Sequence, residues 1–296
     1  MKFAYVCYYV KEVYSAASMP DEDNNLLQFL QHKELDITRE VWNDPTVQWE
    51  QYDVVLLKSP WDYHEQIDTF KAWLADLDAK NIRLLNPYNT VLWNADKHYL
   101  QEIEAAGLPI IPSTFIEPHT PVNWDQLFEQ YNALKLVVKP CISAGAKETI
   151  VLTKENLPGL RPQLAQMLAK EAYMVQPFMD TIAHFGEYSL LYFNGVFSHA
   201  IVKKPKPGDF RVQYQYGGTV VNIAPSPALK ATCDAYVSKF AKGCLYARVD
   251  GVEVDGQFQL MELEMIEPYL FLSMHEGGFE TYYQALMQLT HAASFA

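Results

Sequence analysis

Two glutamates near the carboxyl end of the chain carry the strongest chemical signal. Glu262 and Glu264 alternate with Leu263 and Met265, so in a β-strand both carboxylates project from the same face. Asp250 precedes them on a neighbouring predicted strand. Carboxylates this close repel one another unless a cation lies between them, and hard oxygen ligands suit magnesium held jointly with nucleotide phosphates. A solvent-exposed strand with ordinary glutamates would show the same alternation.

A lysine at the end of an apolar strand is the second candidate. Lys139 closes the predicted strand 135–139, and a loop of small residues, 141–147, follows it. A buried lysine is costly without an anionic partner, and small residues let backbone amides approach phosphate oxygens closely. The pattern favours a phosphate-covering loop, although the GxxxxGK[ST] order of a P-loop is absent. A lysine that merely precedes a turn is the alternative.

A third candidate is the most basic stretch of the chain, residues 202–211, which ends with Arg211. An arginine can bind phosphate or carboxylate through two parallel hydrogen bonds. A solvated, lysine-rich turn would look similar. The eight histidines show no HxxH or HExxH spacing, so the sequence offers no support for zinc catalysis.

The composition limits the classes of protein to which this chain can belong. A chain of 296 residues with 49% hydrophobic and 20% charged residues is typical of two or three folded units in a soluble protein. A net charge of -13 without a basic run argues against a nucleic-acid partner. Four separated cysteines without a CxxC pair fit packing roles in a reducing compartment. With no apolar run of bilayer length, we expect a cytoplasmic protein without a membrane partner.

The first ninety residues alternate strand and helix patterns. Predicted strands at 3–10, 53–58 and 83–85 flank helices that begin near 21–23 and cover 67–79. This alternation predicts an open, mostly parallel sheet, whose ligands bind beyond the carboxyl ends of the strands. The loops at those ends make four residues candidates for substrate binding: Asp21, Trp61, Asp62 and Tyr63. A packing role for Trp61 and Tyr63 is the alternative.

The rest of the chain divides into two α+β parts. Asp96 can begin a helix that carries Lys97 and ends before Gly107. A small unit follows, with predicted strands at 113–117, 135–139 and 148–153 and a helix near 124–131. Later strands read as antiparallel and are covered by two helices. These strands are 173–176, 187–193, 196–203, 246–254 and 258–264, and the helices are 228–242 and 279–292.

The order of these features resembles the ATP-grasp superfamily. A helix lysine comes first, then a strand lysine with its small-residue loop, a basic segment, and finally an aspartate and Glu-x-Glu. The closest likeness is to glutathione-synthetase-like members and to the cyclo-ligases of D-cycloserine biosynthesis. It covers nearly the whole chain through the segments 58–63, 86–87, 93–97, 138–140, 186–189 and 262–264.

The resemblance implies roles for individual residues. Those implied to bind the nucleotide are Lys97, Lys139, the loop residues Ser143, Ala144 and Gly145, the adenine-facing Gln176, Pro177, Phe178 and Met179, and Glu187 at the ribose. Arg211 and Lys139 match the catalytic cations that hold the transferred phosphate. Asp250, Glu262 and Glu264 match ligands of Mg²⁺ or Mn²⁺. Glu264 departs from the glutathione synthetase pattern, in which asparagine is usual.

The resemblance also implies a fold and an activity. We expect a Rossmann-like pre-ATP-grasp domain (1–93), a lid subdomain (94–175) and a carboxyl-terminal subdomain with the metal site (176–296), the two α+β subdomains enclosing ATP. The implied enzyme is an ATP-dependent carboxylate–amine ligase that acts on small amino acids or peptides through an acyl phosphate, and we expect a homodimer. The alternatives are an ATP-grasp phosphotransferase and a non-catalytic, nucleotide-binding regulatory protein.

Overall fold

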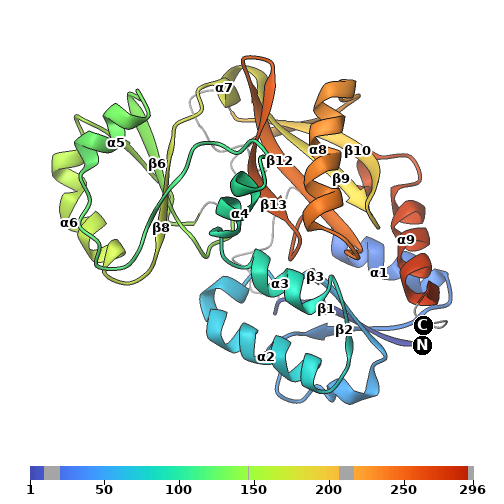
Figure 1. The fold of residues 1–296 in the computed structure, drawn as a ribbon. Helices are drawn as coiled ribbons and strands as arrows, with labels where there is room; N and C mark the ends of the chain where they lie inside the picture. The colour runs from blue at the N-terminus through green and yellow to red at the C-terminus, as the bar shows by residue number, and fades with distance from the viewer. Residues whose placement is uncertain (10–20, 146, 207–216, 293–296) are drawn as a thin grey trace.

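The computed structural model describes residues 1–9, 21–145, 147–206 and 217–292, and these residues form three β-sheets with flanking helices (Figure 1). Arg211 and Ala146 therefore lie outside the described residues. Within the described ranges, no helix combines the length and apolar character needed to cross a membrane.

The first sheet is parallel, with strand order β2-β1-β3-β4. Its strands are β1 (Lys2–Cys7), β2 (Asp36–Val41), β3 (Val54–Ser59) and β4 (Arg83–Leu85), with helices α1 (Glu22–His32), α2 (Ile67–Ala79) and α3 (Tyr88–Asn94) and short 3₁₀ turns η2 (Trp49–Gln51) and η3 (Tyr63–Gln66). Every residue of β3 is buried, as expected for a parallel strand covered on both faces. Strand β2 was not predicted because it is polar and only Ile37 is buried.

The second sheet is antiparallel, with order β5-β8-β6-β7, and forms the separate lobe at the left of Figure 1. Its elements are β5 (Thr114–Ile116), α5 (Trp124–Gln130), β6 (Lys135–Pro140), β7 (Ile150–Thr153), α6 (Leu157–Leu168) and β8 (Tyr173–Pro177). The two helices contribute to one core, which includes Trp124, Phe128 and Leu164. The sequence analysis assigned no element to α6, which has Pro158 in its first turn, where proline is well tolerated, and Pro162 inside the helix.

The third sheet is also antiparallel, with order β11-β10-β9-β12-β13. Its strands are β9 (Glu187–Phe193), β10 (Val196–Lys204), β11 (Thr219–Ile223), β12 (Tyr246–Val254) and β13 (Gln257–Glu264). The remaining helices are α4 (Tyr99–Ala105), α7 (Thr181–Phe185), α8 (Pro227–Phe240) and α9 (Gly278–Ala292), with a 3₁₀ turn η5 (Leu272–Met274).

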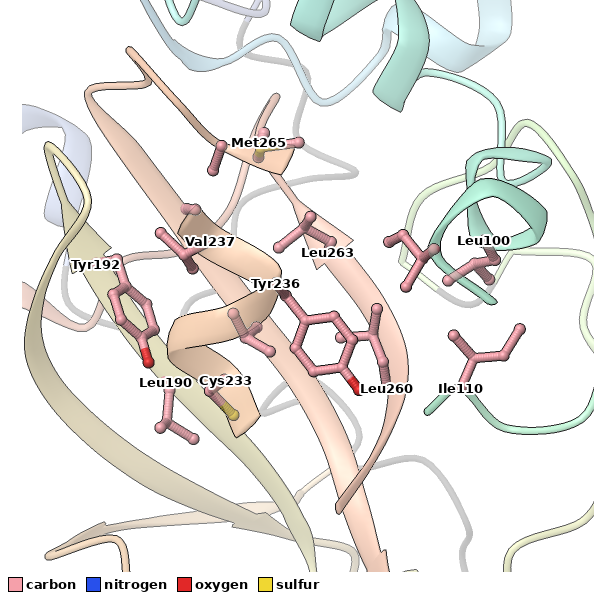
Figure 2. Close-up of a cluster of buried hydrophobic side chains, with 14 of the residues drawn as sticks. Leu100, Ile110, Leu190, Tyr192, Cys233, Tyr236, Val237, Leu260, Leu263 and Met265 are labelled. Atoms are coloured by element: carbon pink, nitrogen blue, oxygen red, sulfur yellow. The ribbon is translucent and has the colours of Figure 1, made fainter. Parts of the chain in front are cut away.

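The packing departs from the expected domain limits in two places. Residues 97–111, expected in the lid, pack on the third sheet: Figure 2 shows Leu100 and Ile110 beside Leu260 and Leu263. Backbone hydrogen bonds join Ile111 N to Leu260 O at 2.9 Å and Leu260 N to Pro109 O at 3.1 Å. Strand β8 also runs past the expected limit at 175, to Pro177.

The first and third sheets share a second core. It includes Phe3 and Leu26 from the amino-terminal part and Phe193 and Tyr282 from the carboxyl-terminal part. Helix α9 lies beside α1, as Figure 1 shows, and Lys33 pairs with Glu280 at 2.6 Å. The second sheet has its own core, and Met174 of β8 and Cys141 after β6 also join the core of the third sheet.

Candidate active site

Strands β12 and β13 present the three predicted metal ligands on one surface. Asp250 lies directly opposite Glu262, and Arg248 lies opposite Glu264. Val249 and Leu263, which alternate with them, are fully buried in the core beneath. The period of two therefore separates a charged face from an apolar face, as the alternation of Glu262 and Glu264 predicted.

A bulge follows Asp250 and requires glycine. The pairing shifts between Asp250 and Gly251, and a Cβ at Gly251 would lie 2.3 Å from the carbonyl oxygen of Gln259 and 2.4 Å from the ring of Phe258. A larger residue would push the two strands apart. Gly251 thus preserves the register that sets Asp250 against Glu262.

Lys97 joins this surface to the loop after β6. Its ammonium lies 3.0 Å from Glu262 Oε1 and donates to the carbonyl oxygen of Ser143 at 2.9 Å. Its backbone N–H donates to Cys141 O at 2.9 Å. Burial opposes the charged form, but Glu262 with Glu267 and Glu264 holds the pKa of Lys97 above its usual value. The buried Lys97 therefore contacts both the acidic surface of β12 and β13 and the small-residue loop after β6.

Lys139 differs from Lys97 in that no carboxylate pairs with its ammonium among the described residues. It is half-buried at the end of β6, and its ammonium forms no ion pair or hydrogen bond with any described residue. Burial, reinforced by the charge of Lys97, lowers its pKa, while Glu262 and Glu187 act in the opposite direction. Its charged form would be stabilised by an added anion such as a phosphate.

Two further cations hold Asp250, and sequence reasoning missed both. Arg248 binds Asp250 through Nε at 3.0 Å and Nη2 at 2.8 Å and also contacts Glu264. Lys203 lies 3.0 Å from Asp250 and 2.5 Å from Glu187. Arg248 precedes Asp250 by two residues on one strand, so the period of two could have placed it on the same face.

The carboxylates respond in opposite ways to this crowding. Burial opposes ionisation of Asp250, but Arg248 and Lys203 outweigh it and hold its pKa well below its usual value. Burial raises the pKa of Glu264 well above its usual value, and repulsion from Asp250 and Glu262 adds to this effect against the attraction of Arg248. The surroundings of Glu264 therefore disfavour its ionised form, although Arg248 contacts it.

The predicted adenine and ribose residues lie along the second and third sheets. Gln176 is buried and donates to Ser113 Oγ at 2.9 Å. Pro177 ends β8, and the chain through Phe178 and Met179 leads to α7, with Phe178 N bonded to Lys135 O at 3.0 Å. Glu187, predicted at the ribose, is paired with Lys203 inside the charged cluster.

The small-residue loop bends toward the first sheet. Ser143 Oγ donates to Pro140 O at 3.2 Å, and Ala144 O accepts from Lys147 N at 3.2 Å. Gly145 has a left-handed φ of 62° with nothing within 4 Å of a Cβ built there. Lys147 reaches Glu65 at 2.8 Å. The loop thus spans from the buried Lys97 to an exposed ion pair with the amino-terminal unit.

The four predicted substrate residues have different surroundings. Asp21 is exposed and caps α1 through Asn24 N at 3.0 Å. Trp61 donates to the carbonyl oxygen of Glu267 at 3.0 Å, just beyond β13. Asp62 is buried and accepts from Trp42 Nε1 at 2.7 Å. Tyr63 packs on Phe70 in the first-sheet core at 5.0 Å between ring centroids. Asp62 and Tyr63 are thus held by internal contacts, whereas Trp61 borders the acidic surface.

A buried cluster at the strand ends of the first sheet was not predicted. Lys58 lies 3.1 Å from both Glu22 and Asp23. Glu22 also accepts from the backbone N–H groups of Leu270 and Leu272 at 2.8 and 2.9 Å. These bonds fix the segment after β13 to α1, so the amino-terminal unit is held against the charged face of the third sheet.

Solved structures with known activities share this architecture over nearly the whole chain. A crystal structure of D-cycloserine synthetase DcsG matches with a TM-score of 0.84 and 26% identity, covering 98% of this chain and 100% of the other. D-alanine–D-alanine ligase from Bacillus anthracis matches with a TM-score of 0.73 and 15% identity over 99% of both chains. ATP-grasp ligase PsnB, with a precursor, Mg and ADP, matches with a TM-score of 0.65, 13% identity and coverage of 97% and 98%. The fold is the ATP-grasp fold, and the protein is an ATP-dependent ligase that forms C–N bonds.

Sequence comparison narrows this class to a family. A family model for the N-terminal domain of D-cycloserine synthetase DcsG matches residues 7–86. The chain is also 30% identical over 269 residues to the cycloserine biosynthesis protein DcsG of Streptomyces lavendulae, covering 85% of this chain and 89% of the relative. The protein therefore belongs to the DcsG family of ATP-grasp enzymes. The resemblance drawn from the residues, the fold class and the assignment as a ligase are confirmed.

Proposed function

We propose that the enzyme activates a small carboxylic acid as an acyl phosphate and joins it to an amine, releasing ADP and phosphate. The observation that carries this proposal is the position of Lys97. It contacts Glu262 at 3.0 Å and the carbonyl oxygen of Ser143 at 2.9 Å. The acidic surface and the small-residue loop therefore border one space, as phosphoryl transfer between a nucleotide and a second substrate requires.

Lys139 and Lys97 are the proposed phosphate-binding cations. Lys139 has no anionic contact among the described residues and its pKa is lowered by burial, which supports a role completed by the phosphates. The loop residues Ser143, Ala144 and Gly145 would cover those phosphates through backbone amides. The segment 176–179 is the proposed adenine contact.

Asp250, Glu262 and Glu264 fit a divalent cation. Burial, with repulsion from two neighbouring carboxylates, raises the pKa of Glu264, and a bound cation would favour its ionised form. Glu262 uses Oε1 to contact Lys97, and its other oxygen bonds no described residue. Oxygen ligands of this kind suit Mg²⁺ or Mn²⁺ shared with phosphates. When bound, such an ion neutralises charge on the transferred phosphoryl group.

The cations of the site account for both chemical steps. In the first, a substrate carboxylate oxygen forms a bond to the γ-phosphorus while the bond from that phosphorus to ADP breaks, and Lys139 stabilises the phosphate oxygens. In the second, the amine attacks the acyl carbon and phosphate leaves. Arg211 is the proposed stabiliser of this second step. Arg248 is a further candidate because it lies among Asp250 and Glu264.

The family relationship supports a substrate class. DcsG relatives are named for D-cycloserine, a cyclic amino-acid derivative, so we propose that the acid and the amine belong to one amino-acid-derived molecule and that ligation closes a ring. Trp61 borders the site and Asp21 begins α1 at the strand ends of the first sheet. Both remain proposed substrate contacts.

A cytoplasmic location is part of the proposal. All four cysteines are free and buried, which fits a reducing compartment.

Hydroxylamine trapping tests the acyl phosphate. The enzyme is incubated with ATP, Mg²⁺, hydroxylamine and a panel of amino acids and O-substituted serines, and both ADP and hydroxamate are measured. Hydroxamate formed in proportion to ADP supports the proposal. A stable phosphorylated product would instead indicate a phosphotransferase. Tight ATP binding with no ADP released on any substrate of the panel would indicate a regulatory protein.

A further inference from the structure

A cluster of mixed ligand types lies beside the active site at the start of α4. One ligand atom each from Asp96, His98 and Cys141 lies within 4.8 Å of the others. Asp96 and His98 flank Lys97, whose backbone N–H bonds Cys141 O at 2.9 Å. The fold thus assembles from distant segments a set of ligands that no histidine or cysteine spacing in the sequence indicated.

The ring of His98 is oriented by two carboxylates. Its Nε2 lies 3.1 Å from Glu117 Oε1, and its Nδ1 lies 2.6 Å from Asp96 Oδ1. The Phe115 ring packs beside it at 4.7 Å between centroids. Both carboxylates can only accept, so each ring nitrogen of His98 faces an acceptor. Glu117 would keep a proton on Nε2, and an ion bound at Nδ1 would take the place of the proton between His98 and Asp96. A carboxylate behind a histidine is the usual support of a metal-binding imidazole.

Cys141 provides a sulfur ligand at the base of this cluster. Cys141 is 1% exposed, and its thiol forms no hydrogen bond with any described residue. Asp96 and His98 are half-buried above it, so a solvent ion reaches the cluster through their side. A water molecule would fill the fourth position of a tetrahedral ion.

We propose that Asp96, His98 and Cys141 form a second metal site, specific for zinc-class divalent ions and separate from the carboxylates of β12 and β13. A set of sulfur, nitrogen and oxygen donors favours Zn²⁺, Co²⁺ or Cd²⁺ over Mg²⁺. Tetrahedral zinc places ligand atoms roughly 3.3–3.8 Å apart, so the cluster must contract by about 1 Å. On binding, the thiol proton and the proton between His98 Nδ1 and Asp96 Oδ1 leave to solvent, and three metal–ligand bonds form.

Such an ion would connect two units of the fold. Asp96 and His98 precede α4, which packs on the third sheet, whereas Cys141 follows β6 of the second sheet. The ion would fasten the segment that carries Lys97 to the segment that follows Lys139. This inference concerns binding alone and does not rest on the proposed ligase chemistry.

Cobalt spectroscopy tests the site in the whole chain. Co²⁺ is titrated with Mg²⁺ in large excess, so that the carboxylate surface does not compete. We expect one equivalent of Co²⁺ to give a thiolate-to-cobalt absorption band that Zn²⁺ abolishes, with binding at least tenfold weaker in His98→Gln. Cys141→Ser should lose the band. Cys244→Ser, which changes a buried cysteine whose sulfur lies 3.9 Å from Met265 Sδ, should keep it.

Three results would overturn the proposal: no band in the wild-type protein, an unchanged band in Cys141→Ser, or unchanged affinity in His98→Gln. Thermal unfolding provides a second measurement that does not depend on the thiol variant folding. Zn²⁺ should raise the unfolding midpoint of the wild-type protein and leave that of His98→Gln unmoved. Equal shifts in both proteins would count against the site.

Discussion

The charged face of the third sheet and the lysine end of β6 are built on opposite principles. Asp250 is surrounded by Ser189 at 2.6 Å, Lys203 at 3.0 Å and Arg248 at 2.8 Å, and its pKa is held low by those cations against burial. Lys139 has no such contact among the described residues, and burial lowers its pKa. The acidic half is therefore preorganised by its own cations, whereas Lys139 has no internal counter-ion in the part of the chain that the structure describes, and under the proposed function the phosphates of ATP would supply one.

The largest expected effect comes from breaking the preorganised half. Asp250→Asn leaves Arg248 and Lys203 buried without their shared carboxylate, so we expect a loss of about 3–5 kcal/mol in the free energy of unfolding and a fall in kcat of about 100-fold or more. Urea unfolding and ADP release measure the two quantities. Asp255→Asn, in the exposed turn of the same hairpin, is the control. An Asp250→Asn protein as stable as this control would refute preorganisation.

Removing Lys139 should instead weaken ATP binding and leave the stability of the protein unchanged. Lys139→Met is expected to weaken ATP binding by about tenfold or more, equal to about 1.4 kcal/mol, without lowering the unfolding midpoint, because no described internal ion pair is lost. Calorimetric titration with a non-hydrolysable ATP analogue gives the affinity. Lys154→Met, at an exposed position just after β7, should leave it unchanged. A strongly destabilised Lys139→Met protein with normal ATP affinity would make the lysine structural.

His199 tests how the segment after β13 supports the acidic half. Its Nε2 contacts Leu270 O at 3.1 Å, and burial, helped by His275, lowers its pKa from 6.5 to about 4. A folded-state pKa below the unfolded value means that the unfolded chain binds more protons, so stability falls as the pH falls. The loss should occur between pH 6.5 and 4 and amount to about 3 kcal/mol.

Urea unfolding across this pH range should therefore show a shallower dependence for His199→Gln than for the wild-type protein. His184→Gln, an exposed histidine, should follow the wild-type curve. Parallel curves for all three proteins would show that His199 is not held neutral by its surroundings.

The smallest expected effect concerns the exposed ion pair at the end of the small-residue loop after β6. Lys147 and Glu65 are 50% and 33% exposed at their side chains, so Lys147→Gln should change the free energy of unfolding by about 0.5 kcal/mol or less. The KM for ATP should rise by no more than about threefold. A double variant with the two charges exchanged should restore it, and failure of that exchange would exclude the ion pair as the cause.

Periodic patterns accounted for most of the fold. The predicted bounds of helix 67–79 and strand 187–193 coincide with α2 and β9, because their apolar positions repeat at the periods of a covered helix and a buried strand. Strand β2 escaped prediction because it pairs through its backbone while most of its side chains remain polar or exposed. Strand β11 likewise leaves its five residues half-buried or exposed.

The site residues also fall into those with a local sequence signal and those that only the paired strands reveal. Glu262 and Glu264 carried a local signal, and the structure sets Glu262 opposite Asp250. Lys203 was missed as a site residue because its importance comes from two carboxylates on other strands, Glu187 and Asp250. Such pairings become visible only when the sheet order is known. Asp62 followed a strand as a substrate residue would, yet the indole of Trp42 binds it.

The most direct test of the account is a crystal structure grown with ADP and Mn²⁺, in which anomalous scattering locates the ion. We expect the ion between Glu262 and the diphosphate, with the ammonium groups of Lys97 and Lys139 on phosphate oxygens. A nucleotide bound away from Lys139, or an ion that does not touch the carboxylates of β12 and β13, would contradict the claim that the two halves form one site.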